Sequence, residues 1–301
     1  MVVTRRGFLA AAAAGAAFVA TGCGSDKPGA VARDGSVTVK HVFGETRIPA
    51  PPTRVVSAGL TSQDDLLALG VVPIAVTEWF GYEPFAVWPW ARDRLGDAQP
   101  AVLSLADGIP VEQIAALSPD LIVATNAGLD ADTYARLSEI APTVAQSGPD
   151  AFFEPWRDQA TTIGQAVFKH DEMQRLIAAV NDRFIKAGED NPDFAGRTVA
   201  LLHGRLDDGE AEPLTPPWRT EFLTAMGLAV TDDPASADVA IWATESDEDQ
   251  AALLADPAIA ERGPANIFTG KELAGAIAFA SVLSYPVVAD RLPALIAGAL
   301  N

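Results

Sequence analysis

From residue 36 onward, short runs of β-branched and apolar residues alternate with segments whose apolar residues recur at helical spacing. Such alternation is typical of α/β layers built on parallel strands. A run at 37–48 that turns around Gly44 predicts an opening hairpin. In the region that follows, the pattern predicts strands at 54–57, 73–76 and 121–124 and helices at 62–69 and 111–117.

The middle of the chain differs, because residues 153–168 and 171–187 form a long stretch of helical pattern with little strand character. After it the first pattern returns in the same order, since residues 197–202, 222–227 and 236–241 repeat the features of 54–57, 66–70 and 118–123. We therefore predict two Rossmann-like α/β lobes with mainly parallel sheets, joined by one long backbone helix, with a ligand cleft between them. Any two βα segments share this order of strand and helix, so a chance similarity between the two regions is the alternative.

The predicted organisation is an N-terminal lobe at 37–150, a helical linker at 151–190 and a C-terminal lobe at 191–301. The C-terminal lobe is shortened. Gly70 and Asp120 are 50 residues apart in the first lobe, whereas the corresponding Gly227 and Asp238 are 11 residues apart in the second.

The first 22 residues resemble an export signal. Arg5 and Arg6 precede an apolar run at 9–20, which is too short to span a bilayer, and Thr21-Gly22 leads into Cys23, the single cysteine. This predicts a Tat-type lipoprotein signal peptide at 1–22, although an ordinary secretory signal is the alternative to Tat, and lipidation of Cys23. Residues 23–36 are small, polar and charged, which predicts a flexible tether to the outer face of the cytoplasmic membrane.

The composition narrows the choice of partners. The chain has 21 basic and 40 acidic residues and a formal charge of −19, so it repels phosphate backbones and we expect no nucleic-acid partner. Attachment to anionic lipid must therefore come from the acyl groups. We expect a monomer.

Three segments carry a family resemblance. They are RVVSAGLTSQDDLLALGVVPIAVTEWFGYEPFAVWPWA from residue 54, GIPVEQIAALSPDLIVATNAGL from residue 108 and YARLSEIAPTV from residue 134. They resemble the helical-backbone, class III substrate-binding proteins of ABC importers, and within them the FecB-type iron–siderophore lipoproteins. The resemblance implies capture of a ferric siderophore and its delivery to a permease and ATPase complex. Haem or cobalamin is the alternative cargo.

The segment 79–90 is rich in aromatic residues and follows the predicted strand at 73–76. Ligands of open α/β sheets bind beyond the carboxyl ends of strands, and flat rings suit a bulky iron chelate or a porphyrin. Phe80 and Phe85 are expected to cap the core of the lobe, which is also the alternative role for the whole set. The predicted ligand contacts are Trp79, Tyr82, Trp88 and Trp90.

The same carboxyl-end rule places Asn126 near the cleft. In the second lobe, the residues after the strand at 197–202 include Arg205 and, further on, Trp218 and Arg219. Guanidinium groups suit the anionic oxygens of iron chelates. Each arginine has an alternative role as an ion-pair partner of Asp207, Asp208 or Glu221.

Docking to the permease is implied by the resemblance alone. In the family a glutamate on each lobe pairs with permease arginines, and the motif GIPVEQIAALSPDL assigns that role to Glu112, with a solvated helix glutamate as the alternative. The shortened second lobe lacks the stretch that would carry the partner glutamate, and Asp232 and Asp233 in the short link are possible substitutes.

Catalysis finds little support in the sequence. The chain has no G-x-S-x-G, H-E-x-x-H, G-x-G-x-x-G or Walker motif, and its three histidines are scattered at 41, 170 and 203. We therefore expect no enzyme, no direct metal ligands and no resident cofactor, because iron would arrive inside its chelator. In the haem alternative, one tyrosine or histidine would bind the iron axially. A cell-surface enzyme or structural lipoprotein with this fold is the alternative of another class.

Overall fold

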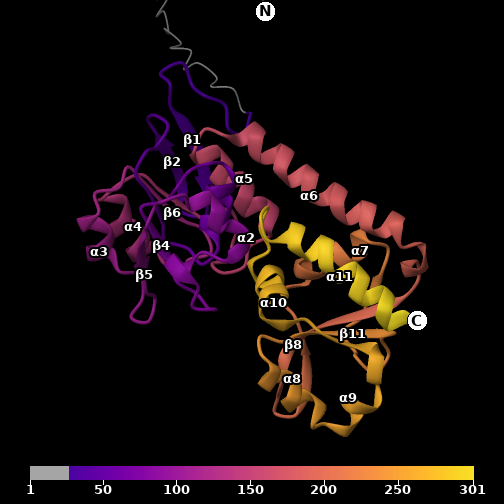
Figure 1. Cartoon of the computed structure of the whole chain (residues 1–301). Helices are drawn as coiled ribbons and strands as arrows, with labels where there is room; N and C mark the ends of the chain where they lie inside the picture. Colours follow the sequence, from indigo (N-terminus) through magenta and orange to yellow (C-terminus); the bar gives the residue numbers. More distant parts are fainter. Residues whose placement is uncertain (1–26) are drawn as a thin grey trace, which may run out of the picture.

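The computed structural model describes residues 27–301 (Figure 1). The predicted signal peptide at 1–22, with Arg5 and Arg6, and the predicted lipidation site Cys23 lie outside the described residues. Between residues 27 and 301, no helix has both the length and the apolar character needed to cross a membrane.

The first lobe is built on a five-stranded sheet in which every neighbouring pair of strands is parallel. The strand order is β5-β4-β3-β6-β7, so the chain starts in the middle of the sheet and winds outward in both directions. The strands are β3 (Val55–Ser57), β4 (Ala75–Thr77), β5 (Ala101–Leu103), β6 (Leu121–Ala124) and β7 (Thr143–Ala145). The connecting helices are α1 (Ser62–Ala68), α2 (Pro89–Arg92), α3 (Val111–Ala116) and α4 (Ala131–Ser138). An antiparallel hairpin precedes the sheet, formed by β1 (Val37–His41) and β2 (Gly44–Ile48).

This sheet is buried on both faces, which explains the continuous apolar runs of its strands. Val55 of β3 packs in one apolar cluster with Leu66 of α1, whereas its neighbour Val56 packs in a second cluster with Ile114 of α3. Successive strand residues point to opposite faces, so adjacent apolar residues serve two different layers.

The second lobe has a sheet of order β10-β8-β11-β12 whose neighbouring strands are parallel, with β9 antiparallel to β8. Its strands are β8 (Thr198–Asp207), β9 (Glu210–Pro213), β10 (Ala229–Val230), β11 (Val239–Ala243) and β12 (Asn266–Phe268). Its helices are α7 (Glu221–Ala225), α8 (Asp247–Leu254), α9 (Pro257–Glu261), α10 (Gly270–Phe279) and α11 (Tyr285–Leu300). The α/β class and the two lobes with mainly parallel sheets are as the sequence predicts.

The two lobes share one small motif that explains the sequence repeat. Asp120 precedes β6, and its carboxylate accepts a hydrogen bond from the backbone N–H of Thr53 ahead of β3, at 2.8 Å. Asp238 precedes β11 and accepts from the N–H of Thr198 at the start of β8, also at 2.8 Å. In each lobe, therefore, an aspartate ties the beginnings of two adjacent parallel strands together.

The linker segment consists of two helices, α5 (Trp156–Ala166) and α6 (His170–Asp190), rather than the one long helix predicted. Its first helix begins three residues later than the pattern at 153–168 predicts. Pro155 disfavours helical backbone at the residue before it, and Phe153 has a left-handed φ of 58°. Phe168 has a left-handed φ of 62°, which interrupts the helical conformation and separates the two helices.

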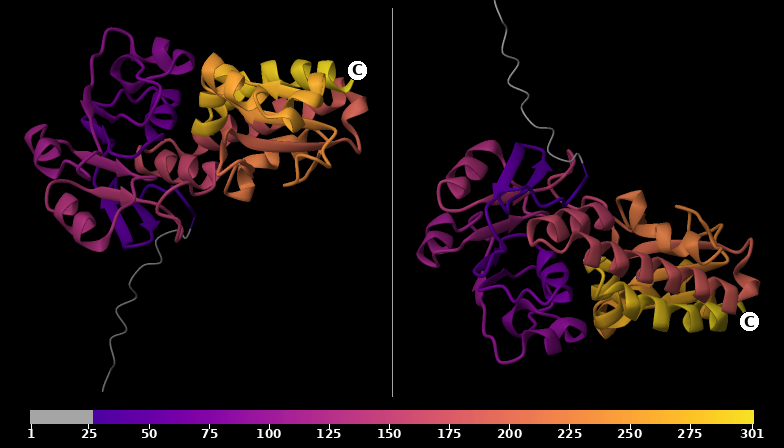
Figure 2. Two further views of the ribbon diagram at one scale, coloured as in Figure 1. Left: turned by 90° about the horizontal axis from the view of Figure 1, so that it is seen from below. Right: turned by 90° about the horizontal axis from the view of Figure 1, so that it is seen from above.

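A single apolar core runs through both lobes. Val55 of β3 in the first lobe and Leu201 of β8 in the second belong to one buried cluster, together with Ile177 and Phe184 of α6. Figure 1 shows α6 running from the first lobe along the second, and the views of Figure 2 show α11 beside it. The lobes are thus packed together and not only tethered.

Two adjacent carboxyl groups are fully buried where the lobes meet. Asp64 of α1 accepts hydrogen bonds from Ser281 Oγ of the second lobe at 2.6 Å and from Trp90 Nε1 at 2.8 Å. Asp65 accepts from Gln159 Nε2 of α5 at 2.9 Å. Burial raises the pKa of Asp64 to about 6 and that of Asp65 to about 8, and the neighbouring charge of Asp64 adds to the rise at Asp65.

We expect these carboxyl groups to make stability pH-dependent. Because their folded-state pKa values lie above those of the unfolded chain, the folded state holds protons that the unfolded state has released, and their contribution to stability falls as pH rises from about 4 to about 8. Asp65→Asn, which is neutral in both states, should melt above the wild type at pH 8 by roughly 3 °C or more, and this advantage should shrink at pH 5.

Thermal melts of both proteins at the two pH values check this. Asp182→Asn, at an exposed aspartate of α6, is the matched control and should give the same difference from the wild type at both pH values. An equal advantage of Asp65→Asn at pH 5 and pH 8 would contradict the assignment.

Candidate functional site

The carboxyl ends of strands from both lobes meet at a cleft, where ligands of open α/β sheets bind. A cavity of about 280 Å³ lies there. Its walls come from both halves of the chain, and they include Trp79 and Phe80 after β4, Phe153 before the linker helices, and His203, Arg219 and Glu245 of the second lobe.

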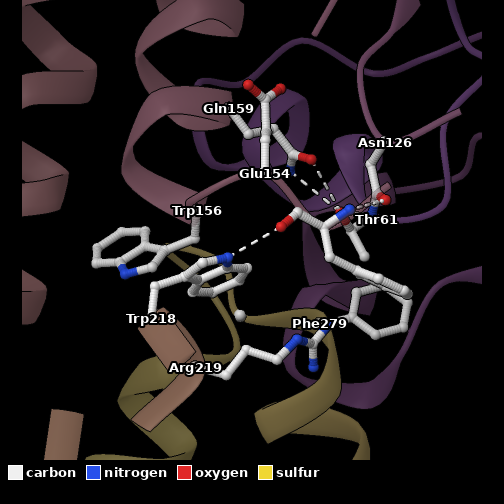
Figure 3. A pocket seen from close by; sticks show the side chains of 10 residues that line it. Thr61, Asn126, Glu154, Trp156, Gln159, Trp218, Arg219 and Phe279 are labelled. Carbon is white, nitrogen blue, oxygen red and sulfur yellow. Dashed lines mark hydrogen bonds between the residues drawn. The ribbon is translucent and has the colours of Figure 1, made fainter. Parts of the chain in front are cut away.

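Two further hollows adjoin this cavity. One, of about 290 Å³, shares His203 and Glu245 with it and extends along the second lobe past Arg205. The other is a small pocket of about 10 Å³, room for about one water molecule, that reaches Thr61 and Asn126 (Figure 3). These two residues follow β3 and β6, the strands between which the direction of winding reverses.

A wider groove of about 710 Å³ lies elsewhere, between the β1–β2 hairpin, α5 and residues 27–32. It is open and lined by side chains such as Lys40, Glu45 and Asp158. It reaches the carboxyl end of one strand, β7, at Ser147, and none of its lining residues is aromatic. We therefore assign the ligand site to the interlobe cleft despite its smaller volume.

Phe153 lines the cleft, and its backbone is held by hydrogen bonds from both lobes. Its backbone N–H donates to Asn126 Oδ1 of the first lobe at 2.8 Å, and its carbonyl accepts from Trp218 Nε1 of the second lobe at 2.9 Å. Asn126 also donates to Thr61 Oγ1 at 3.1 Å, which fixes the orientation of its amide. Left-handed backbone in a phenylalanine costs energy and is found where the surrounding structure imposes it.

Arg219 supplies a buried positive charge to the cleft. Its side chain is only 4% exposed, and its guanidinium lies over the rings of Phe153 and Trp218, 4.5 and 5.4 Å from their centroids. One Nη donates to the carbonyl of Ala278 at 3.1 Å, while the buried Nε has no partner. Burial lowers the pKa of Arg219, although the group stays cationic.

The predicted alternative for Arg219, an ion pair with Glu221, does not form. Glu221 pairs with Arg157 instead, at 2.6 Å. Across residues 27–301, neither Arg219 nor Arg205 has a carboxylate within ion-pair distance. Two cations in the cleft are therefore available to an anionic ligand.

Other titratable groups in the cleft are shifted by burial. Burial lowers the pKa of His203, so its imidazole is mainly neutral at pH 7. Burial also raises the pKa of Glu245, with Asp249 adding to the rise and the charges of Lys271 and Arg205 opposing it. The second-lobe wall thus carries both cationic and acidic groups.

The aromatic residues of the segment 79–90 have different positions from one another, and not all of them lie where they were predicted. Trp79 lines the cavity and is therefore placed where it can contact a ligand, although the contact itself stays a prediction. Tyr82, predicted beside it, is 89% exposed and is not one of the residues that line the cavity. Its loop is fixed to the second lobe by Lys271, whose Nζ donates to the carbonyl of Gly81 and to Glu83, each at 2.8 Å.

Trp88 and Trp90 are packing residues in this structure, and neither is among the residues that line the three cavities of the cleft. Trp88 is 1% exposed and stacks on Trp90 with ring centroids 4.9 Å apart. Trp88 also packs against Gly275 of α10, and Trp90 donates to Asp64. Both rings also pack against Phe279 at the interface between the lobes, so the structure gives them a packing role and their ligand contact stays a prediction.

The two phenylalanines expected to cap the core are also placed differently. Phe80 lines the cavity beside Trp79, and Phe85 is partly exposed at 37%. Left-handed φ values at Phe85 and Ala86 redirect the loop, which breaks any simple alternation between inward and outward side chains.

The remaining predicted residues are near the cleft in different ways. Asn126 and Trp218 line the small pocket of about 10 Å³, where both hold Phe153, and Arg205 lines the cavity of about 290 Å³. Glu112 lies away from the cleft on α3. Its side chain is 84% exposed and pairs with Arg136 at 2.6 Å.

Sequence reasoning missed Phe153, Thr61 and Glu245 as cleft residues. Thr61 follows β3 as Asn126 follows β6, so the carboxyl-end rule was sufficient to find it, and Glu245 follows β11 in the same way. Phe153 was assigned to a helix, and only Pro155 two residues later indicated that the helix begins after it.

A family model described as periplasmic binding protein matches residues 55–292. The chain belongs to this family. The members of the family are binding proteins rather than enzymes, and the family predicted from the sequence is confirmed.

Individual relatives of this periplasmic binding protein are also named as binding proteins. The crystal structure of a periplasmic solute binding protein from Mycobacterium smegmatis is 64% identical, with a TM-score of 0.87, over 89% of this chain and 100% of that one. The probable siderophore-binding lipoprotein YfiY of Bacillus subtilis is 34% identical over 178 residues, 58% of this chain and 51% of YfiY. The Fe(3+) dicitrate-binding periplasmic protein FecB of Escherichia coli is 27% identical over 195 residues, 65% of this chain and 62% of FecB. The matches thus span about half to three fifths of the length of these two relatives.

The packing role of Trp88 in this periplasmic binding protein can be tested at Gly275. A Cβ added there would lie 2.5 Å from the Trp88 ring, so Gly275→Ala should lower the free energy of unfolding by about 1–3 kcal/mol. Gly298→Ala in α11 is the matched control, because nothing lies within 4 Å of its added Cβ, and it should be stabilising by up to about 1 kcal/mol. Urea unfolding measures both, and equal stabilisation by the two substitutions would refute the packing role.

Proposed function

We propose that this protein captures a ferric chelate in the interlobe cleft and delivers it to an ABC importer. The observation that carries the proposal is the cavity whose aromatic wall, Trp79, Phe80 and Phe153, faces the buried and unpaired cation of Arg219. Apolar rings bury the organic part of a chelate, and the guanidinium receives its anionic oxygens. The names of YfiY and FecB, which refer to siderophore and ferric dicitrate binding, support the choice of cargo.

The protein acts by binding alone in this proposal, with no resident cofactor and no catalysis. The iron enters and leaves inside its chelator, so the cleft has to recognise the outer surface of the complex. The continuous core between the lobes supports a nearly rigid receptor with only a small closing motion.

Haem is the second candidate cargo, because His203 lines both the cavity of about 280 Å³ and the cavity of about 290 Å³ in the cleft. A mainly neutral imidazole is able to bind haem iron axially. The two cargoes differ in a direct signature, since axial ligation shifts the haem absorption band and a chelate bound without protein ligands to iron keeps its own spectrum.

The cargo can be identified by quenching of intrinsic tryptophan fluorescence, titrated with ferric citrate, ferrichrome, haem and cobalamin. We expect saturable quenching by a ferric chelate. Trp79→Ala should weaken binding at least about tenfold because Trp79 forms part of the cavity wall. Tyr82→Ala is the matched control from the same loop and should leave the dissociation constant within about twofold, because Tyr82 lies outside the cavity. No saturable response to any of the four compounds would refute the proposal.

Docking to the permease through Glu112 is part of the proposal. Its ion pair with Arg136 is at the surface, where such pairs contribute little to stability, so the carboxylate can exchange partners at small cost. The second lobe has no counterpart in the described residues. β10 leads to β11 through a short turn that contains Asp232 and Asp233, whereas β5 and α3 lie between β4 and β6 in the first lobe.

Glu112→Ala should therefore lower uptake of the iron chelate by cells severalfold while the dissociation constant of the purified protein stays unchanged. Glu139→Ala, at an exposed glutamate at the end of α4, is the matched control and should change neither. Unchanged uptake by the Glu112 variant would remove this glutamate from the docking surface.

Export and anchoring complete the proposal. The twin arginines and Cys23 support a lipoprotein held at the outer face of the cytoplasmic membrane. The relative YfiY is named a lipoprotein, which supports the same location.

A further inference from the structure

Phe153 differs from the other aromatic residues of the cleft in how it is held. Its backbone has φ 58°, which is strained for a residue with a side chain, and both of its peptide polar groups are occupied by partners from different lobes. The preceding turn is fixed as well, because the N–H of Gly128 donates to the carbonyl of Ala151 at 3.0 Å. The position of the Phe153 ring is therefore imposed by both lobes together.

The ring in turn holds Arg219. The guanidinium carbon of Arg219 lies 4.5 Å from the Phe153 centroid, closer than it lies to the ring of Trp218. Among the described contacts of Arg219, the hydrogen bond to the Ala278 carbonyl is the single polar one made by its side chain. No carboxylate of residues 27–301 pairs with it, so the face of the Phe153 ring replaces the counter-ion that a buried arginine usually has.

We propose that Phe153 is a positioning residue that holds the Arg219 guanidinium unpaired in the cleft and thereby selects anionic over neutral iron chelates. This inference rests on the proposed function of the cleft. A ring face stabilises the cation without neutralising it, whereas a carboxylate would satisfy the same group and repel an anion. The Nε of Arg219, buried and without a partner, is a donor that an anionic oxygen can satisfy.

The two hydrogen bonds of the Phe153 backbone give this residue a second property. Because Asn126 and Trp218 hold its N–H and carbonyl from opposite lobes, a change in the angle between the lobes moves the ring and with it the guanidinium. Charge recognition and lobe packing therefore share one residue.

The test compares the affinities of the full protein for two probes, ferric citrate, which is anionic, and ferrichrome, a neutral ferric trihydroxamate. The variants are Phe153→Leu, Phe153→Trp, Arg219→Gln and the double variant Phe153→Leu/Arg219→Gln. Phe152→Leu is the matched control, because Phe152 is the adjacent residue, is 46% exposed and packs over Gly128 outside the cavity.

We expect the wild type to prefer ferric citrate. Phe153→Leu should weaken ferric citrate binding about tenfold, the loss expected for a desolvated cation–π contact, and ferrichrome binding much less. Arg219→Gln should weaken it at least as much, and the double variant should be no weaker than Arg219→Gln alone. Phe153→Trp, which keeps a ring face, and Phe152→Leu should stay near the wild type.

Three results would overturn the inference while leaving the proposed function intact. They are a wild-type preference for ferrichrome, an equal loss for both probes in Phe153→Leu, and losses that multiply in the double variant. If the wild type binds only ferric citrate, the double variant decides by itself. Binding of neither probe to a wild-type protein with a normal thermal melt would refute the proposed function and the inference with it.

Discussion

The apolar core that passes from one lobe to the other is the constraint on which the rest of the structure depends. At its centre, Trp156 of α5, Phe184 of α6 and Phe222 of α7 pack around Tyr285 of α11, with ring centroids between 5.3 and 5.7 Å apart. Burial of such rings contributes much of the stability of a core. The lobes cannot separate widely without exposing this cluster, so the cleft above it has a nearly fixed width.

A fixed cleft allows ionisable groups to be buried that a flexible one would expose to water. Asp64 and Asp65 lie under the aromatic loop, and Arg219 lies in the wall of the cleft, each held by neutral partners. Buried ionisable groups without counter-ions destabilise a protein, and here the destabilisation is offset by packing elsewhere. Groups of this kind concentrate at functional sites, and in this protein they lie on both sides of the interlobe junction.

The architecture was predictable because it depends on patterns that repeat along the chain. Runs such as 121–124 are apolar throughout because both faces of the sheet are covered, and Asp120 and Asp238 recur because each ties two strands together. The cleft was less predictable, because a tryptophan that lines a cavity and one that fills an interface have the same composition and spacing. Trp79 and Trp88 differ only in where the loop directs them, and the left-handed residues Tyr82, Phe85 and Ala86 set that direction. Sequence pattern does not reveal such a backbone.

The net charge of the chain adds a reason for a short-range mode of recognition. With a formal charge of −19, the protein repels an anionic chelate at distances up to the Debye length, about 8 Å in physiological salt. Attraction therefore has to come from groups that act at contact and are protected from water. Arg219 meets both conditions, since it is buried, unpaired and held against a ring in place of a carboxylate. An exposed lysine would be screened by salt and offset by the surrounding acidic residues, so an acidic surface requires a buried cation if its ligand is an anion.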